Sequence, residues 1–438
     1  MAGDTAPRDA AVAQITPLQR MKAIVGGSAG NLVEWYDWFA YSSFAIYFAP
    51  HFFPKGDTTA QLLQNAGVFA LGFMMRPLGA WLMGLYADHA GRRAALAVSV
   101  GMMCFGSFAI ALLPTYAQVG ALAPVGLLVA RLVQGLSIGG EYGASATYMS
   151  EMAGRQRRGM WASFQYVTLI GGQLTALSVL IILQAFMAES DLEAWGWRIP
   201  FAIGGLLAVV VFWIRTGMAE SASYLNAKAE GLERAKTMML FVRHPRETAI
   251  IFVLTAGGSL AFYTYTTYMQ KFLVNTAGFA KDTATWITAA ALIIYMFAQP
   301  LFGWLSDRIG RKTTIAFAFA GGAVATYPVM AALSGTTSAL GALALVVLLL
   351  MVLSGYTAVS GLVKAELFPA NVRALGVALP YAIANALFGG TAEYAALWFK
   401  DVGAEQGFYV YVSVIMAGAF VVAVRLRNTN VMSLIKED

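Results

Sequence analysis

Long apolar runs separated by short polar loops repeat along the whole chain. Each run has 18 or more residues, enough for a helix to cross about 30 Å of hydrocarbon. Twelve such helices are expected, and the one long polar interval divides them into two sets of six. The predicted spans are 22–49, 62–86, 93–113, 120–149, 158–187, 197–215, 248–275, 283–305, 312–333, 339–365, 374–399 and 406–426. The pattern predicts an all-α polytopic membrane protein.

The amino-acid composition also indicates a membrane protein, and it excludes sites that depend on several cysteines. Of the 438 residues 59% are hydrophobic and 12% are charged, about half the charged share of an ordinary soluble domain. The short alternating segments of a transmembrane β-barrel do not dominate the pattern. The single cysteine, Cys104, lies in an apolar run, which excludes a disulfide framework and a cysteine metal site.

Basic residues gather in the loops that share a side with both termini. The loops of the opposite side contain little beyond Lys55, Lys281 and Lys400. Positive charge stays in the cytoplasm, so we expect both termini there. The net charge of +6 comes from these loops and does not indicate nucleic-acid binding. The predicted organisation is a cytoplasmic tail at 1–21, a six-helix bundle at 22–215, a cytoplasmic linker at 216–247, a second six-helix bundle at 248–427 and a cytoplasmic tail at 428–438.

The two halves carry matching loops. "GLYADHAGRR" at 84–93 resembles "GWLSDRIGRK" at 303–312, and each lies between the second and third spans of its half. "SEMAGRQRRG" and "AELFPANVRA" follow the fourth spans, and in each an acid precedes a base by seven residues. The charged residues of these loops are Asp88, Arg92, Asp307, Arg311, Glu151, Arg158, Glu366 and Arg373. Such a duplication indicates a transporter built around a central axis.

These loops also identify a family. The Gly-xxx-Asp-xx-Gly-Arg-Arg loop and "RLVQG" in the fourth span resemble the major facilitator superfamily. "GNLVEWYDW", "FMMRPLGAW" and "WGWRIPF" are similar to its metabolite–proton symporter branch, and "SFQYVTLIGGQL", "FYTYTTYMQKFLVNTAG" and "NALFGGTAEY" to the α-ketoglutarate carriers within it. The resemblance covers the whole chain. It implies proton-coupled uptake of α-ketoglutarate across the bacterial inner membrane. Citrate, shikimate, another dicarboxylate or a zwitterionic osmolyte are the alternative substrates.

Two carboxylates stand inside the first span. Glu34 and Asp37 lie about 12 to 15 residues into it, near the middle of the bilayer. A charge at that depth costs about 2.5–3.5 kcal/mol and marks a functional site by default. Burial favours a neutral carboxyl group and a nearby arginine favours its charged form, so an acid that alternates between the two can load and release a proton. We predict proton coupling here, with a preference for Asp37; the other interpretation is an acid that only neutralises an arginine.

Cations at membrane depth indicate an anionic substrate. Arg76 in the second span offers a planar fork to a carboxylate, and it is our first candidate for substrate binding. It could instead pair with Glu34 or Asp37. Lys271 in the seventh span could attract a second carboxylate or extend to the outer headgroups. Lys364 in the tenth span and Asn385 in the eleventh are weaker substrate candidates.

Three further charged residues have less certain roles on sequence alone. Arg198 opens the sixth span at the outer surface, and a structural role is favoured over substrate binding. Arg131 begins "RLVQG", and the resemblance implies that it links protonation to substrate binding; the alternative is a buried pairing partner. Glu141, in the same span, could line the path, act in gating or carry a proton.

The charged loops lie too far from the bilayer midplane to touch a centrally bound substrate. We predict that they gate the transporter by bridging the two halves in one state and separating in the other. The alternative is that they only enforce topology.

An enzyme or a channel fits the sequence less well. His51, His89 and His244 are widely separated, and HExxH does not occur. A channel normally needs a selective pore in a symmetric assembly. We therefore expect a carrier without a cofactor or metal, whose partners are a small dicarboxylate, protons and the lipid bilayer, and for which a monomer suffices.

Overall fold

The computed structural model describes residues 17–90, 92–138, 157–216, 242–369 and 372–426. Every regular element in these ranges is helical. The predicted C-terminal tail, most of the predicted N-terminal tail and most of the predicted linker lie outside them, as do Glu141 and Glu151. Asp88 and Arg92 stand on helices, but their side chains are not among those described.

The first half of the chain forms the helices that precede the linker, and the second half those that follow it. The first half contains α1 (Pro17–Phe52), α2 (Thr58–Ala90), α3 (Arg92–Leu112), α4 (Tyr116–Val119), α5 (Leu122–Ile138), α7 (Arg158–Ala162), α8 (Phe164–Phe186), α9 (Glu189–Ala194), the 3-10 helix η2 (Gly196–Arg198) and α10 (Ile199–Thr216). The second half contains α13 (Pro245–Tyr265), α14 (Met269–Asn275), α15 (Lys281–Ile309), α16 (Arg311–Ser334), α17 (Ala339–Thr357), α18 (Ser360–Glu366), α19 (Arg373–Ala384), the π-helix η3 (Asn385–Gly389), α20 (Ala392–Asp401) and α21 (Glu405–Arg425).

These helices match the predicted spans. Within the described residues, nine helical segments are long and apolar enough to cross a membrane, and two shorter apolar ones cover Ala97–Leu112 and Leu122–Ser137. With α1 they account for all twelve predicted spans, and the predicted all-α polytopic fold is confirmed. Large apolar side chains point out of the bundle. Such a surface is stable in lipid, whereas a protein surrounded by water rarely exposes it. The most exposed include Trp213, Phe297 and Val324.

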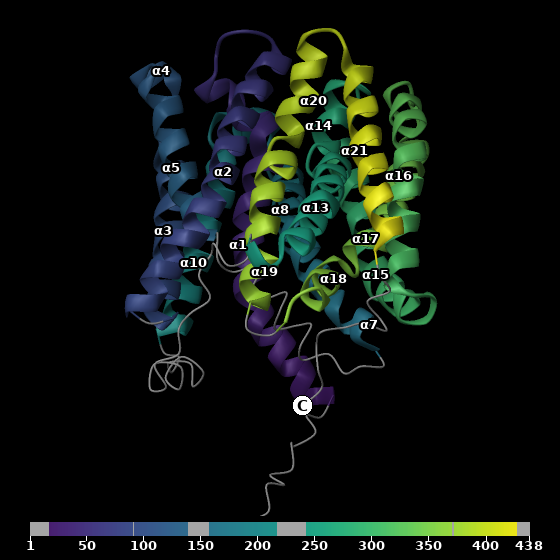
Figure 1. Ribbon diagram of the computed structural model, residues 1–438. Helices are drawn as coiled ribbons and strands as arrows, with labels where there is room; N and C mark the ends of the chain where they lie inside the picture. The colour runs from purple at the N-terminus through teal and green to yellow at the C-terminus, as the bar shows by residue number, and fades with distance from the viewer. Residues whose placement is uncertain (1–16, 91, 139–156, 217–241, 370–371, 427–438) are drawn as a thin grey trace, which may run out of the picture.

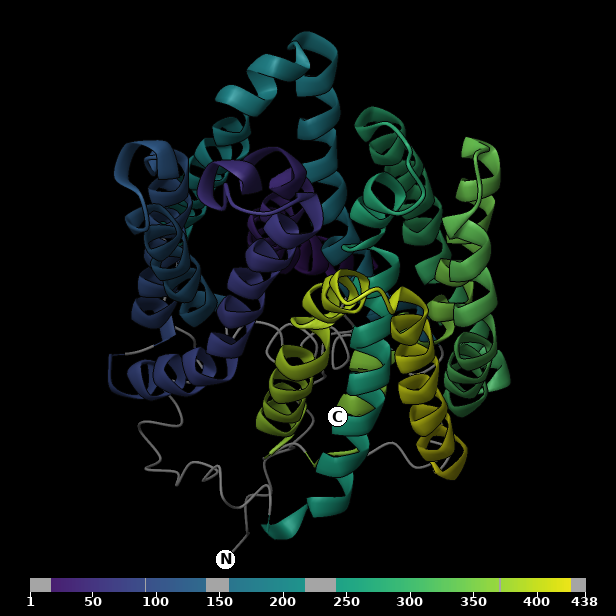
Figure 2. The same cartoon turned by 90° about the horizontal axis from the view of Figure 1, so that it is seen from above.

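The two halves lie side by side, and their helices run in roughly the same direction (Figures 1 and 2). In Figure 1 the start of α1, α7 and α18 mark the lower end of the bundle, and α4 and the turn from α20 to α21 mark the upper end. The halves meet where α2 packs against η3 and α20, and where α15 packs against α7 and α8.

Three spans of the second half are broken inside the bundle. The seventh changes from α13 to α14, where the Tyr268 N–H donates to the Tyr263 carbonyl five residues back. The tenth breaks between α17 and α18, and the eleventh contains the π-turn η3, closed by Gly390 N–H on the Asn385 carbonyl at 2.8 Å. Irregular backbone at membrane depth is tolerated only where protein or a polar path surrounds it. The breaks therefore point to the middle of the bundle as the place to look for a site.

Candidate functional site

Asp37 is the centre of a buried polar network in the first half. Its side chain on α1 is only 1% exposed. Gln134 of α5 donates from Nε2 to Asp37 Oδ2 at 2.6 Å, and the Ser107 hydroxyl of α3 donates to Oδ1. Arg131 Nη1 lies 4.0 Å from Asp37 Oδ2 and donates to Gln134 Oε1 at 2.8 Å. Three helices thus bring an acid, an arginine and a bridging amide together.

A proton on Asp37 would change this network. The ionised carboxylate only accepts hydrogen bonds, and both of its hydrogen-bonded neighbours donate to it. A protonated carboxyl group needs an acceptor, which the Ser107 hydroxyl can become by rotating. Loss of the negative charge would also remove the counterion of Arg131. The charge state of Asp37 therefore decides how firmly Arg131 is held.

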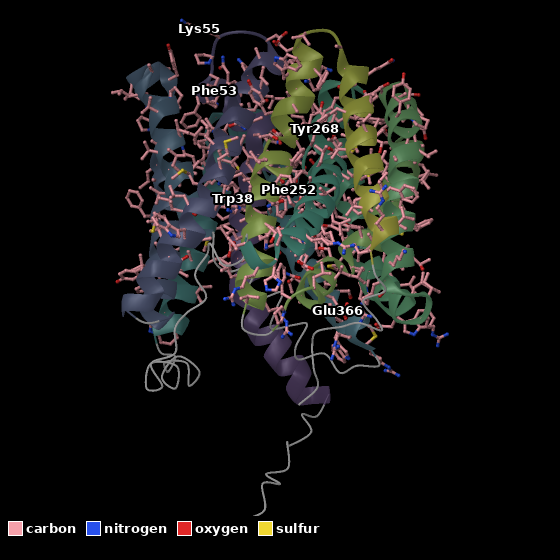
Figure 3. The ribbon with its side chains drawn as sticks, in the orientation of Figure 1. Trp38, Phe53, Lys55, Phe252, Tyr268 and Glu366 are labelled. Atoms are coloured by element: carbon pink, nitrogen blue, oxygen red, sulfur yellow. The ribbon has the colours of Figure 1, made fainter. Side chains whose placement is uncertain are left out.

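Two guanidinium groups stack on one tryptophan. Trp38 lies at mid-height of the bundle (Figure 3). Arg131 Cζ is 3.8 Å from the centroid of its ring, and Arg76 Cζ is 4.5 Å away. Arg76 also stacks on Phe73 at 3.9 Å. Such cation–π contacts hold a guanidinium in place without using its N–H groups.

Both arginines keep donors free. Nε and Nη2 of Arg76 and of Arg131 are buried without a hydrogen-bond partner. Buried donors are normally satisfied, and leaving one unpaired costs about 1–3 kcal/mol or more for a charged group. Unpaired, preorganised guanidinium donors at mid-bundle are suited to receive a carboxylate.

Polar groups from the second half face Arg76. The Tyr263 side chain of α13 lies beside Arg76 and Asn385, and its ring packs edge-on against Phe73 at 5.3 Å. The amide of Asn385 is buried next to the Tyr263 hydroxyl. Glu34 is buried, as predicted from its depth in the span. The arginine and the amide come from opposite halves.

Lys271 is fully buried in the second half. Its ammonium donates to Glu393 Oε2 of α20 at 2.7 Å and to the Ser42 hydroxyl of α1 at 2.6 Å. The charge therefore lies inside the protein and not at its outer surface. Lys364 is also buried; its ammonium lies 3.4 Å from the Ser360 hydroxyl and 4.4 Å from the Tyr381 ring centroid.

Arg198 has a different surrounding. Its Nη1 donates to the carbonyls of Ala111 and Leu113 at 2.8 and 2.7 Å. These are carbonyls at the C-terminal end of α3, which have no partner within their own helix. A cation at that position also complements the helix dipole. The contacts fit the structural role that the sequence favoured.

Charged loop residues join the halves at the lower end. Asp307 of α15 accepts hydrogen bonds from the Gly159 and Met160 N–H groups of α7 at 2.8 and 3.1 Å. Arg311 Nη2 lies 3.6 Å from Asp307 and 3.3 Å from Glu366, which Figure 3 labels at this end. Asp307, Arg311 and Glu366 are thus gathered around a contact between the halves.

The matching residues Arg158 and Arg373 lie at the same end. Arg158 is buried close to Asp307. Arg373 donates from Nε to the carbonyls of Ala365 and Phe368, both at 3.2 Å. Arg158 thus lies near an acid of the other half, whereas these two hydrogen bonds of Arg373 lie within the second half.

Sequence reasoning missed a second junction, at the upper end. Lys281 at the start of α15 pairs with Glu189 at 2.8 Å and Glu193 at 2.5 Å, both on α9 of the first half. Gln184 adds hydrogen bonds to Tyr47 at 2.7 Å and Thr285 at 3.3 Å. The acidic loop residues near the sixth span were the available signal. The hydroxyls of Ser42 and Ser107 gave none, because single serines are common in apolar helices.

The comparisons with known proteins agree with this architecture. The family described as sugar (and other) transporters matches residues 22–247 and again 237–438. The alpha-ketoglutarate permease of Escherichia coli K12 is 51% identical over 428 residues, which cover 98% of each protein. The citrate-proton symporter of Klebsiella pneumoniae is 31% identical over 371 residues, covering 85% of this chain and 83% of that protein.

Solved structures share the fold. A partially occluded inward open structure of the xylose transporter XylE from E. coli superposes with a TM-score of 0.72 at 19% identity, covering 92% of this chain and 96% of that one. A D-xylose-proton symporter structure gives a TM-score of 0.73 at 18% identity, covering 94% and 99%. With the family matched along both halves, the chain belongs to the sugar (and other) transporter family of the major facilitator superfamily.

Proposed function

We propose that this protein is a proton-coupled carrier that moves α-ketoglutarate into a bacterial cell by alternating access. The observation that carries the proposal is the pair of guanidinium groups stacked on Trp38, each with buried Nε and Nη2 donors that have no partner. An anion is the ligand that such donors recognise best. The 51% identity to the E. coli permease along nearly its whole length supports α-ketoglutarate as that anion.

The substrate would bind between the halves. Arg76 takes one carboxylate through its free Nε and Nη2, and the buried amide of Asn385 from the other half contacts the same molecule. Lys271 is the candidate for the second carboxylate. Lys364 is a further candidate for substrate contact, closer to the lower end. Arg198 is assigned to structure, since its Nη1 is used on α3 carbonyls.

Protons would be exchanged at Asp37. Gln134 connects this acid to Arg131, so the charge on Asp37 would determine how strongly the Arg131 guanidinium is held. Glu34 and Glu141 remain alternative proton sites. A proton taken up from outside and released inside would complete each cycle.

The membrane potential explains why protons are needed. Moving a dianion into the cell against a membrane potential of 100 mV, negative inside, costs about 4.6 kcal/mol of free energy, which is twice the roughly 2.3 kcal/mol for one charge. One proton leaves a net charge of −1, which the potential still opposes. Two protons make the cycle electroneutral, and three let the potential drive uptake.

Alternating access would use the two junctions between the halves. Opening the lower end breaks the Asp307 contact with Gly159, and opening the upper end breaks the pairs of Lys281. We assign the lower end to the cytoplasm, with both termini there, because the basic loops lie on that side. The proposed unit is a monomer in the inner membrane with bundles at 22–215 and 248–427, and it transports its substrate without altering it.

Uptake into proteoliposomes tests the proposal. Radiolabelled α-ketoglutarate is supplied under an inward proton gradient, with unlabelled citrate, succinate, shikimate and proline as competitors. We expect saturable uptake that a protonophore abolishes and that dicarboxylates inhibit most. A gradient-independent uptake would contradict proton coupling.

Citrate is the second candidate substrate. The 31% identity to a citrate-proton symporter favours it over other organic acids. If labelled citrate accumulates and α-ketoglutarate does not, the carrier mechanism stands and the substrate changes.

A further inference from the structure

Lys271 already holds a carboxylate. Its ammonium lies 2.7 Å from Glu393 Oε2 and 2.6 Å from the Ser42 hydroxyl, and that hydroxyl lies 3.3 Å from the same Oε2. All three side chains are buried. Lys271 and Glu393 belong to α14 and α20 of the second half, whereas Ser42 belongs to α1 of the first.

An ammonium and a hydroxyl on one carboxylate oxygen form the kind of contact that a dicarboxylate substrate would need here. We propose that Glu393 is an internal competitor: it occupies Lys271 while the carrier is empty, and the second carboxylate of the substrate displaces it. This inference rests on the proposed function and names the step by which that site accepts its second charge.

Displacement follows from electrostatics. In a buried site with a low effective dielectric, two carboxylates beside one ammonium repel each other strongly. A substrate carboxylate therefore cannot simply join the pair. When Glu393 leaves, the ammonium keeps one negative partner, and the displaced carboxyl group must take up a proton or another donor, because a buried unpaired charge is costly. Substrates with a single carboxylate would be satisfied by Arg76 and would leave the pair intact.

The position of Ser42 connects this exchange to the two halves. Its hydroxyl accepts from Lys271 and donates to Glu393, so it ties α1 to both α14 and α20. Displacing Glu393 breaks one of these ties. Substrate binding thereby changes a contact between the halves, which is what a ligand must do to shift their equilibrium.

A double-mutant cycle on the purified full-length protein tests the inference. Calorimetry measures the Kd of α-ketoglutarate for the wild type, Glu393→Gln, Lys271→Gln and the double variant. We expect Glu393→Gln to tighten binding about tenfold, because the competing charge is gone. Lys271→Gln should weaken binding, and in that background Glu393→Gln should change Kd less than about twofold.

Two controls isolate the effect. 2-Oxopentanoate has the same carbon chain without the second carboxylate, so Glu393→Gln should leave its Kd unchanged. Glu405→Gln removes the acid of another lysine–glutamate pair in the same half, whose Nζ and Oε2 atoms are 3.8 Å apart in the pair with Lys400. It should not change the Kd of α-ketoglutarate.

The possible failures are distinguishable. If the wild type binds α-ketoglutarate and Glu393→Gln weakens that binding, or tightens it equally without Lys271, Glu393 is no competitor and the proposed function stands. If the wild type binds citrate alone, the proposed substrate is wrong and the cycle is repeated with citrate. If it binds neither, both proposals fall. Should Glu393→Gln not fold, Glu393→Asp retracts the charge from Lys271, and tighter binding is again expected.

Discussion

Asp37 and Arg131 lie 4.0 Å apart and share Gln134, which donates to the acid and accepts from the arginine. Arg131 donates to Gln134 from Nη1, and its Nε and Nη2 have no hydrogen-bond partner. The amide of Gln134 can respond to both groups at once. Protonation of Asp37 would therefore remove the negative charge near Arg131 and alter the hydrogen bond between Arg131 and Gln134. This makes Asp37 a better proton-coupling candidate than its depth in the span alone would indicate.

Replacing Asp37 by asparagine should separate exchange from accumulation. The amide mimics a permanently neutral side chain, so substrate can still cross but no proton is carried with it. We expect Asp37→Asn proteoliposomes to exchange internal for external α-ketoglutarate, while an imposed proton gradient no longer raises the internal concentration above equilibrium. Glu34→Gln is the matched control and should still accumulate substrate. Accumulation by Asp37→Asn, with loss in Glu34→Gln, would move the proton site to Glu34.

Replacing Arg76 by lysine should damage binding although the charge is kept. The fork of the guanidinium offers two parallel donors, whereas an ammonium is a point charge. Losing one charge-assisted hydrogen bond of about 1.5–3 kcal/mol corresponds to about a tenfold to hundredfold rise in Kd. Arg76→Ala should abolish measurable binding. Calorimetry on both variants checks this, and wild-type affinity in either one would remove Arg76 from the site.

The spans could be predicted from sequence because lipid imposes one simple rule on each helix. Apolar length fixes where a span lies, and all twelve predicted spans have a counterpart in the described helices. The π-turn at Asn385 was beyond this reasoning. A break in a helix depends on what packs around it, and the Gly389–Gly390 pair only permits one. Here Gly389 lies against the Tyr263 ring, where a Cβ would come within 2.7 Å.

The candidate site was only partly visible in the sequence. Buried charges such as Asp37, Arg76 and Lys271 could be found because ionisable residues in apolar runs are expensive. Their partners could not be assigned. Lys271 and Glu393 are 122 positions apart, and the helix geometry of one span says nothing about which distant span faces it. Long-range pairing needs the fold.

Replacing Arg198 should reduce stability and leave substrate recognition unchanged. Its guanidinium satisfies two carbonyls at the end of α3, so Arg198→Gln should cost about 1.5–3 kcal/mol of folding free energy. We expect a lower Tm with an unchanged KM for uptake. Arg308→Gln is the control, because that exposed cation stacks on Trp304 at 4.1 Å and should shift Tm little. A raised KM with an unchanged Tm would instead indicate that Arg198 binds the substrate.

The lower junction depends on two glycines. A Cβ on Gly303 of α15 would lie 2.5 Å from the Gly159 carbonyl oxygen of α7, and backbone cannot move aside as a side-chain tip can. Asp307 holds the same two segments together through the Gly159 and Met160 N–H groups. Any side chain at Gly303 should thus disfavour the state in which these helices touch.

We therefore expect Gly303→Val to populate a state open at the lower end. Ala162 of α7 is buried against α18 and α19 of the other half at the same end, so a cysteine at this position reports on opening, once the only native cysteine has been removed by Cys104→Ser. Its alkylation by N-ethylmaleimide in membrane vesicles should be faster in Gly303→Val than in the parent. Gly101→Val is the control, because a Cβ there meets no atom within 4 Å. Equal rates in all variants would mean that this contact does not limit opening, and the gating role of Asp307 would lose its support.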